Sequence, residues 1–178
     1  IANRMINGTQ HIITWHVDDL KSSHKDPKVN DKFLSWLKTK YASDKIGEIR
    51  AIRGNKHDYL GMTLDFQIPG VLMLDMSFYI KKMIKKFPEK LTQKLKCPWN
   101  ENLFKVDEKS SKLSQKKIKI FHTFVMKGMF LCKRARQDVL PGIVFLATRV
   151  KDPNQQDYIK LVKLMNYLKA TEDVIPKM

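Results

Sequence analysis

The part of the sequence that decides the fold lies near its start, where residues 5–20 are MINGTQHIITWHVDDL. Asn7-Gly8 stands between two apolar runs, and this dipeptide is the strongest short-range signal for a two-residue β-hairpin turn. The second apolar run ends at the adjacent carboxylates Asp18 and Asp19, where we expect the chain to reverse again. The stretch therefore predicts successive antiparallel strands with two carboxylates at the tip of a hairpin.

Beyond this stretch, short strands give way to helices. Asp26-Pro27 predicts the cap and first residue of a helix over 27–41, with one apolar face. Further strands are expected over 48–53, 58–66 and 71–74, the last two joined by a turn at Pro69-Gly70. Helices are expected over 77–87 (capped by Ser77), 114–134, 140–149 and from Asp152-Pro153 onward, with a long polar connection over 89–112. The pattern predicts an α+β fold, in which residues 1–75 are rich in strands and residues 76–178 are helical.

Charge is the unusual feature of the composition. The 178 residues include 34 Lys and Arg against 18 Asp and Glu, a net charge of +16, and only six of the basic residues are Arg. Lys is a flexible point charge suited to phosphates, whereas Arg is the better reader of base edges. The excess of Lys indicates a polyanionic partner bound without sequence preference.

Other classes of protein are excluded by composition. An apolar content of 43% is too high for a disordered chain, and no apolar run approaches the length of a membrane span. Two cysteines, Cys97 and Cys132, cannot form a disulfide framework, and the five His show no zinc-ligand spacing. The absence of a signal-peptide pattern favours an intracellular protein that is not secreted.

Asp18 and Asp19 are the one feature that suggests chemistry. Adjacent carboxylates repel each other unless a cation lies between them or one is protonated. A tight turn can aim both at one place, which would make half of a divalent metal site, and Mg²⁺ prefers such oxygen ligands. The alternative is that the pair is only a solvated turn.

Four segments together resemble a known family. Residues Trp15–Leu20 resemble the catalytic hairpin of reverse transcriptases of Copia-type (pseudovirus) LTR retrotransposons, in which an aromatic residue is followed by Val-Asp-Asp. Three more segments occur in the family's order. Asp58–Met62 resembles the Leu-Gly primer-grip hairpin, Ala135–Val139 the Thr-Arg-Pro-Asp-Ile segment, and Tyr167–Thr171 the Tyr-Leu-Lys-Gly-Thr segment that precedes RNase H.

The resemblance implies a fold and an activity. Residues 1–75 would be part of a reverse-transcriptase palm, carrying the catalytic and primer-grip hairpins, and residues 76–178 the thumb and connection helices that lead toward RNase H. The intact enzyme would be an RNA-directed DNA polymerase, a nucleotidyltransferase that uses Mg²⁺ or Mn²⁺. Its partners would be deoxynucleoside triphosphates and a primer–template, either an RNA/DNA hybrid or a DNA duplex. Because only 17 residues precede Asp18 and none is acidic, the first catalytic Asp and the fingers lie outside this sequence, and we expect the fragment alone to be inactive.

The resemblance also implies roles for individual residues. Asp18 would be a direct metal ligand, with Asp19 as a second ligand or its support. His16 stands where the family usually has Tyr, near the primer end. The primer strand would be held by Tyr59, Leu60 and Gly61. The nucleic-acid backbone would be contacted by Lys81, Lys82, Lys85 and Lys86.

Two alternatives remain open. The chain could be a non-catalytic nucleic-acid-binding remnant of a decayed element, with the same basic surface and no metal. It could instead be a basic scaffold on an anionic membrane surface, because the 77–87 segment is amphipathic.

The aromatic residues Trp15, Trp36 and Trp99 could stack on bases, although aromatics at helical or strand spacing are more typical of a core. For a reverse transcriptase we expect no membrane partner, and a place in cytoplasmic virus-like particles or the nucleus.

Overall fold

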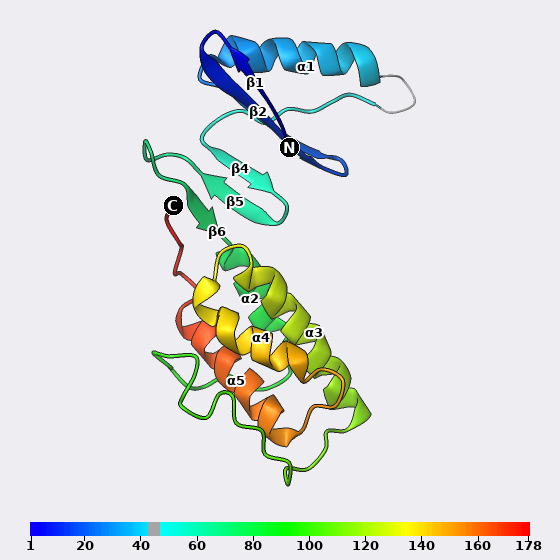
Figure 1. The fold of residues 1–178 in the computed structure, drawn as a ribbon, viewed down its shortest axis with the longest axis vertical. Coiled ribbons are helices and arrows are strands. Elements are labelled where there is room, and N and C mark those ends of the chain that lie inside the picture. Colours follow the sequence, from blue (N-terminus) through cyan, green and yellow to red (C-terminus); the bar gives the residue numbers. More distant parts are fainter. Residues whose placement is uncertain (43–46) are drawn as a thin grey trace. The chain divides into compact units, whose positions relative to one another are not determined.

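The computed structural model of the chain describes residues 1–42 and 47–178. It divides into two compact units, Ile1–Leu60 and Gly61–Met178 (Figure 1). The described residues form two three-stranded sheets and five α-helices, which confirms the α+β class. Strands β5 and β6 group with the helices in the second unit, whereas the division into palm and thumb parts at residue 75 stays a prediction.

The first sheet has the order β1-β2-β3, and both of its pairs are antiparallel. Its strands are β1 (Ala2–Ile6), β2 (Thr9–His16) and β3 (Asp19–Ser23). Asn7 and Gly8 join β1 to β2 with φ of 51° and 72°, the left-handed values that a type I′ turn needs. The predicted hairpin and the second reversal are both confirmed.

Helix α1 (Pro27–Tyr41) packs against one face of this sheet. Its cap is the predicted Asp26, whose side chain accepts a hydrogen bond from the backbone N–H of Lys28. His11 of β2 meets the ring of Phe33 edge-on at 5.5 Å between centroids. Only Val29 of the helix is buried, and Trp36 and Tyr41 are exposed, so the predicted apolar face is covered along only part of its length.

Residues 48–75 differ from the prediction in two places. No strand forms over 48–53, where Ile52 is 73% exposed and so lacks the burial that would stabilise a strand. The single strand that the residue pattern predicts over 58–66 is two strands, β4 (Lys56–Tyr59) and β5 (Met62–Asp65), because Leu60 and Gly61 turn the chain with φ of 51° and 76°. The resemblance of Asp58–Met62 to a hairpin implied this turn.

The second sheet has the order β4-β5-β6, with β6 at Met73–Asp75. The predicted pairing of the strands on either side of Pro69-Gly70 is therefore confirmed as β5 with β6. The C-terminal residues pair with the other side of β6. Leu72 and Met178 exchange two backbone hydrogen bonds of 2.9 Å, and Leu74 N–H donates to the carbonyl of Pro176. This pairing, which the sequence analysis missed, covers an edge of the sheet.

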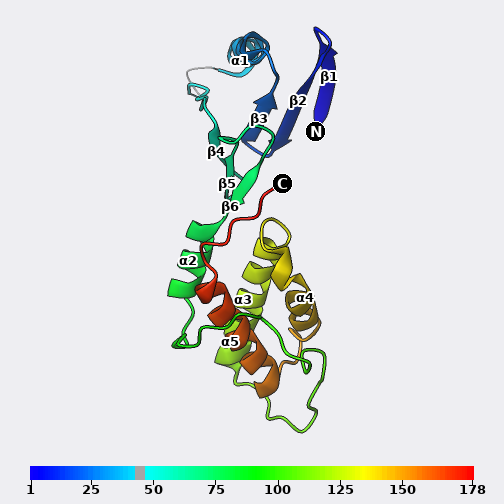
Figure 2. The same ribbon diagram turned by 90° about the vertical axis from the view of Figure 1, so that its left-hand side faces the viewer.

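The helices of the second unit are α2 (Ser77–Lys85), α3 (Gln115–Cys132), α4 (Leu140–Thr148) and α5 (Gln155–Ala170), with a 3₁₀ turn at Gln137–Val139. Figure 2 shows α5 beside α3, and α5 also contacts α2 and α4. The core between these helices is fully buried and includes Ile80, Phe121, Val125, Leu131, Cys132, Val139, Ile143, Leu146, Leu161, Leu164, Met165 and Leu168. Within the described ranges, no helix is long and apolar enough to cross a membrane.

Helix starts were predicted with mixed success. Helix α3 begins one residue after the expected start, because Ser114 is its cap and accepts from Lys117 N–H. Ser77 does not cap α2; it is the first helical residue, and its own N–H donates to Asp75 Oδ1 at 2.7 Å. Helix α5 begins after Asn154 rather than at Asp152-Pro153, because Asn154 and Asp157 form a reciprocal capping box.

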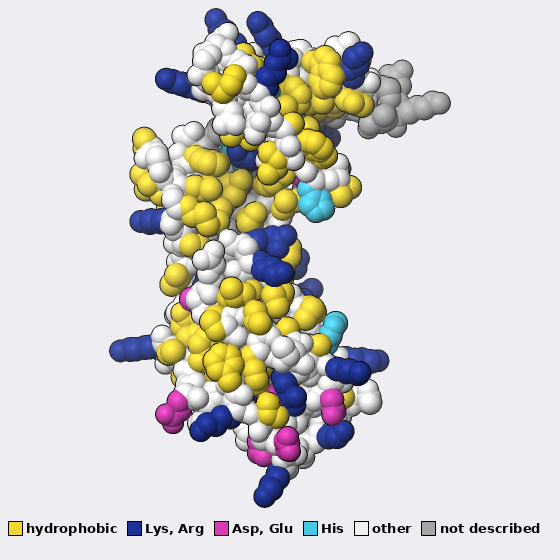
Figure 3. Space-filling model, in the orientation of Figure 1, with side chains coloured by type: hydrophobic (Ala, Val, Ile, Leu, Met, Phe, Trp, Pro, Cys, Tyr) yellow, Lys and Arg dark blue, Asp and Glu magenta, His cyan; other side chains and the backbone are white. Residues whose placement is uncertain are grey.

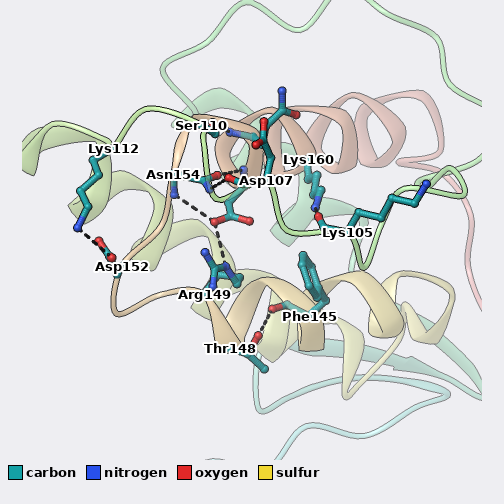
Figure 4. A network of polar contacts seen from close by, with 12 residues as sticks. Lys105, Asp107, Ser110, Lys112, Phe145, Thr148, Arg149, Asp152, Asn154 and Lys160 are labelled. Atoms are coloured by element: carbon teal, nitrogen blue, oxygen red, sulfur yellow. Dashed lines mark hydrogen bonds and ion pairs between the residues drawn. The ribbon is translucent and has the colours of Figure 1, made fainter.

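The connection over 89–112 contains no helix, as predicted, but hydrogen bonds join it to the start of α5 (Figure 4). Asn154 Nδ2 donates to the carbonyl of Asp107 at 2.9 Å, and Gln155 N–H donates to the carbonyl of Ser111. The buried carboxylate of Asp157 accepts from Arg149 Nε at 3.1 Å. One network therefore joins the connection, the end of α4 and the start of α5.

Candidate active-site hairpin and nucleic-acid interface

The carboxylates Asp18 and Asp19 lie at a tight two-residue turn. His16 pairs directly with Asp19, so only Val17 and Asp18 make the turn between β2 and β3. Val17 is 88% exposed and has φ of 54°, a left-handed value that is strongly disfavoured for a β-branched side chain. Such a conformation costs about 1–3 kcal/mol and tends to occur at functional sites. The strain lies at the residue that precedes the two carboxylates.

Alternation along the strands gives the hairpin two different faces. Residues on one strand two positions apart share a face, as do residues directly opposite each other. His11 lies on the face packed against α1, so His16, Asp19 and Lys21 lie on the other face. Partial burial lowers the pKa of Lys21, whose ammonium donates to Ser23 Oγ at 2.6 Å. The face away from α1 thus carries a carboxylate, an imidazole and an ammonium group.

The hairpin offers donor atoms that suit a hard divalent cation. Asp18 and Asp19 are both exposed and present carboxylate oxygens, the ligands that Mg²⁺ prefers. Over residues 1–42 and 47–178, no group of three or more His, Cys, Asp or Glu is placed to hold a metal ion. The two carboxylates therefore fit part of a magnesium site, and the described part of the chain does not bring a third to them.

The segment Tyr59-Leu60-Gly61 forms the second hairpin tip. Tyr59 ends β4, and Leu60 and Gly61 make the turn into β5. A Cβ added to Gly61 would lie 3.5 Å from Cζ of Phe130, an ordinary contact, so glycine is required here by its φ of 76° and not by a close approach. This tip and the Asp18–Asp19 tip belong to different sheets.

Helix α2 is amphipathic, with one apolar face and one basic face. Ile80 and Met83 are buried, and the predicted lysines are all exposed: Lys81, Lys82, Lys85 and Lys86. Lys81 lies 3.6 Å from Asp173. On the face in Figure 3, Lys and Arg side chains are spread over both units, while Asp and Glu gather mainly over the helical unit. The amphipathic division is confirmed, and the contact with a nucleic-acid backbone stays a prediction.

The structure brings together two of the segments that carry the resemblance. Arg136, 1% exposed, donates from Nε and Nη2 to the carboxylate of Asp138 at 2.9 and 2.8 Å. Its Nη1 donates to the carbonyl of Thr171 at 2.9 Å, and Tyr167 Oη donates to Asp138 Oδ2 at 2.7 Å. Ala135–Val139 and Tyr167–Thr171 thus meet in one network.

Burial and the hydrogen bonds of this network shift the pKa values of Asp138 and Tyr167, an effect that the sequence pattern did not indicate. Burial alone would raise the pKa of Asp138, but hydrogen bonds from Arg136 and Tyr167 outweigh it and hold this pKa below its usual value. For Tyr167, burial and then the hydrogen bond to Asp138 raise the pKa. The two segments have a structural role here, and the signal was an Arg-x-Asp set among apolar residues in a chain otherwise rich in Lys.

A scan against models of protein families, a search of curated proteins and a search of solved structures each found no match.

Proposed function

We propose that the chain is part of an RNA-directed DNA polymerase, the reverse transcriptase of a Copia-type LTR retrotransposon. In this proposal residues 1–75 are part of the palm and residues 76–178 are the thumb and connection. The chain contributes two of three metal-binding aspartates and the primer grip, and the third carboxylate comes from outside the described residues.

The observation that carries the proposal is the strained hairpin at Val17. A Val-Asp-Asp sequence that forms a two-residue turn between antiparallel strands presents both carboxylates at an exposed tip. A solvated turn without function has no need of a β-branched residue at positive φ, where Asn or Gly would fit without strain. Selection for the tip, rather than for stability, accounts for this residue.

Asp18 is the direct ligand of a divalent ion in this proposal, and Asp19 is a second ligand or its support. Bound Mg²⁺ or Mn²⁺ would supply activation of the primer 3′-hydroxyl and neutralisation of the triphosphate charge. His16, opposite Asp19, lies near the primer end, where an imidazole can donate a hydrogen bond.

The nucleic acid is a primer–template, which α2 and the Leu60-Gly61 turn hold. Lysines on the exposed face of α2 contact backbone phosphates, and Tyr59, Leu60 and Gly61 contact the primer strand. Deoxynucleoside triphosphates are the second substrate. A polymerase of this class works in cytoplasmic virus-like particles or in the nucleus.

The test is primer extension by a longer polypeptide, which includes the in-frame sequence encoded upstream of Ile1. We expect extension with Mg²⁺ or Mn²⁺, and its loss in Asp18→Asn and Asp19→Asn. Asp152→Asn is the matched control, because Asp152 is an exposed carboxylate that pairs with Lys112 at the surface. Extension that survives Asp18→Asn would refute the proposal.

A second candidate is nucleic-acid binding without catalysis. It is favoured by the two-carboxylate site, which no third ligand completes in the part of the chain that the structure describes. Under this candidate, a stop codon or unrelated sequence lies upstream, and Asp18→Asn changes nothing beyond a small gain in affinity for nucleic acid. The upstream sequence and the variant together separate the two functions.

A further inference from the structure

A groove lies between the first sheet and helix α1, on the sheet face opposite to His16 and Asp19. Its volume is about 570 Å³, within the range of small-ligand sites. Ile13 lines it from β2, and Val29, Phe33 and Trp36 line it from α1. The groove lies wholly within the first unit, and the polymerase proposal gives it no role.

Aromatic rings line the helix side of this groove. Trp36 is 49% exposed and stacks on Phe33, with ring centroids 5.9 Å apart and an interplanar angle of 20°. Phe33 in turn forms a T-shaped contact with the ring of His11. Tyr41 meets Trp36 at 85° on the side of the helix C-terminus, with centroids 6.3 Å apart. Neighbouring rings therefore support Trp36, and half of its surface is exposed.

Three cations line the same groove. Arg4 comes from β1, and Lys28 and Lys32 come from the first turns of α1. None of the three forms an ion pair within the ranges that the structure describes. The carboxylate among the lining residues is Asp26, and one of its oxygens already accepts from Lys28 N–H at 2.9 Å. The groove is therefore cationic and suits an anion with an aromatic or apolar part.

We propose that this groove binds single-stranded nucleic acid, with a base stacked on Trp36 and the flanking phosphates held by Arg4, Lys28 and Lys32. Single strands are bound in this way, by aromatic side chains set in a basic groove. A duplex does not fit, because its bases are already stacked and cannot reach a ring inside a groove. A second copy of the chain does not fit either, because a two-fold contact on this groove would bring like charges together.

This proposal is independent of the polymerase proposal, since it needs neither Asp18 and Asp19 nor the lysines of α2. The probe is a fluorescein-labelled oligothymidylate of about ten nucleotides, a length within the site sizes of single-strand grooves. Binding to the whole chain is followed by fluorescence anisotropy at low salt and over a salt titration.

Trp36 is tested by two substitutions. Trp36→Leu should weaken binding about tenfold, as expected for loss of one stacked base, while Trp36→Phe should keep most of the affinity. Phe104→Leu is the control, because Phe104 is an exposed aromatic in the second unit. Circular dichroism verifies that each variant is folded. If Trp36→Leu unfolds the first unit, Trp36→Phe and the lysine variants decide the question.

The lysines are tested through the salt dependence. The double variant Lys28→Gln/Lys32→Gln should reduce the slope of log affinity against log salt by about 1.4, since each phosphate contact on a single strand contributes about 0.7. Lys94→Gln/Lys96→Gln removes the same charge from exposed positions in the second unit and should change the slope much less.

Four outcomes would overturn the proposal. The first is wild-type binding by both the Trp36→Leu and the Lys28→Gln/Lys32→Gln variants, and the second is an equal loss of affinity in the control variants. The third is binding of a duplex of the same length that depends on Trp36 to the same extent. The fourth is that dimerisation or binding to phosphatidylserine vesicles depends on Trp36 while binding of the oligonucleotide does not. Failure of the polymerase proposal has a different signature, namely no primer extension by the longer polypeptide.

Discussion

The guanidinium of Arg136 donates to both oxygens of Thr171, to the backbone carbonyl at 2.9 Å and to the side-chain hydroxyl at 2.7 Å. The two residues are 35 positions apart, and the contact joins the turn before α4 to the end of α5. The same guanidinium forms a bidentate pair with Asp138, a geometry that lysine cannot reproduce. One buried side chain therefore organises the end of the helical unit from which the C-terminal residues continue to β6.

Arg136→Met should destabilise the second unit by about 3 kcal/mol, because removing one partner of a buried pair leaves the other groups unpaired. The loss of stability should not exceed this value by much, since the Asp138 side chain is 39% exposed and water can solvate its carboxylate. Urea unfolding measures the change. Lys112→Ala is the control, since the exposed Lys112–Asp152 pair at 3.2 Å should contribute less than about 1 kcal/mol. A cost below that control for Arg136→Met would contradict the assigned role.

Val17→Asn should stabilise the first unit by about 1 kcal/mol, because Asn tolerates the left-handed conformation and Val does not. The increase is measured as a rise in the urea midpoint at unchanged slope. Val106→Asn, an exposed valine with negative φ, should be neutral within about 0.5 kcal/mol. In the longer polypeptide, we expect the more stable Val17→Asn variant to lose polymerase activity. An equal gain at both valines would show that the effect is not strain relief.

What could be predicted from the sequence was mostly local. Asn7-Gly8 predicts its own turn because both residues tolerate positive φ, and Asp26 predicts the start of α1 because its carboxylate reaches the N–H two residues on. The residue pattern alone predicts one strand through Leu60-Gly61, because leucine rarely adopts positive φ, whereas the resemblance implied a hairpin over Asp58–Met62.

Long-range contacts could not be predicted in this way. Nothing in the local pattern of residues 176–178 indicates that they pair with β6, more than a hundred residues earlier. The resemblance marked Arg136 and Thr171 without giving a reason, and only the packing of α5 brings them together. The groove beside Trp36 was also missed, because its aromatic spacing equally predicts a buried helix face.

Acid should destabilise the first unit through His11. Burial and the neighbouring His24 lower the pKa of His11 in the folded state below its value of 6.5 in the unfolded chain. The unfolded state therefore binds the proton more readily, and stability falls as the pH drops through the unfolded pKa toward the folded one. The thermal midpoint should be lower near pH 5 than near pH 8, and His11→Gln should flatten this part of the profile. A profile that His11→Gln leaves unchanged would assign the acid sensitivity to another group.

The lysines of α2 should dominate the salt dependence of primer–template binding. Replacing Lys81, Lys82, Lys85 and Lys86 by Gln should reduce the slope of log affinity against log salt by about 3–4, since each phosphate contact on a duplex contributes about 0.9. The smaller reduction, of about 3, is expected if Lys81 keeps its ion pair with Asp173, whose Oδ1 lies 3.6 Å from Lys81 Nζ, and so contacts no phosphate. The control replaces Lys90, Lys94, Lys96 and Lys151, which are exposed elsewhere in the same unit, and should have a clearly smaller effect. If the two quadruple variants lose the same slope, net charge binds the nucleic acid and α2 is not a dedicated surface.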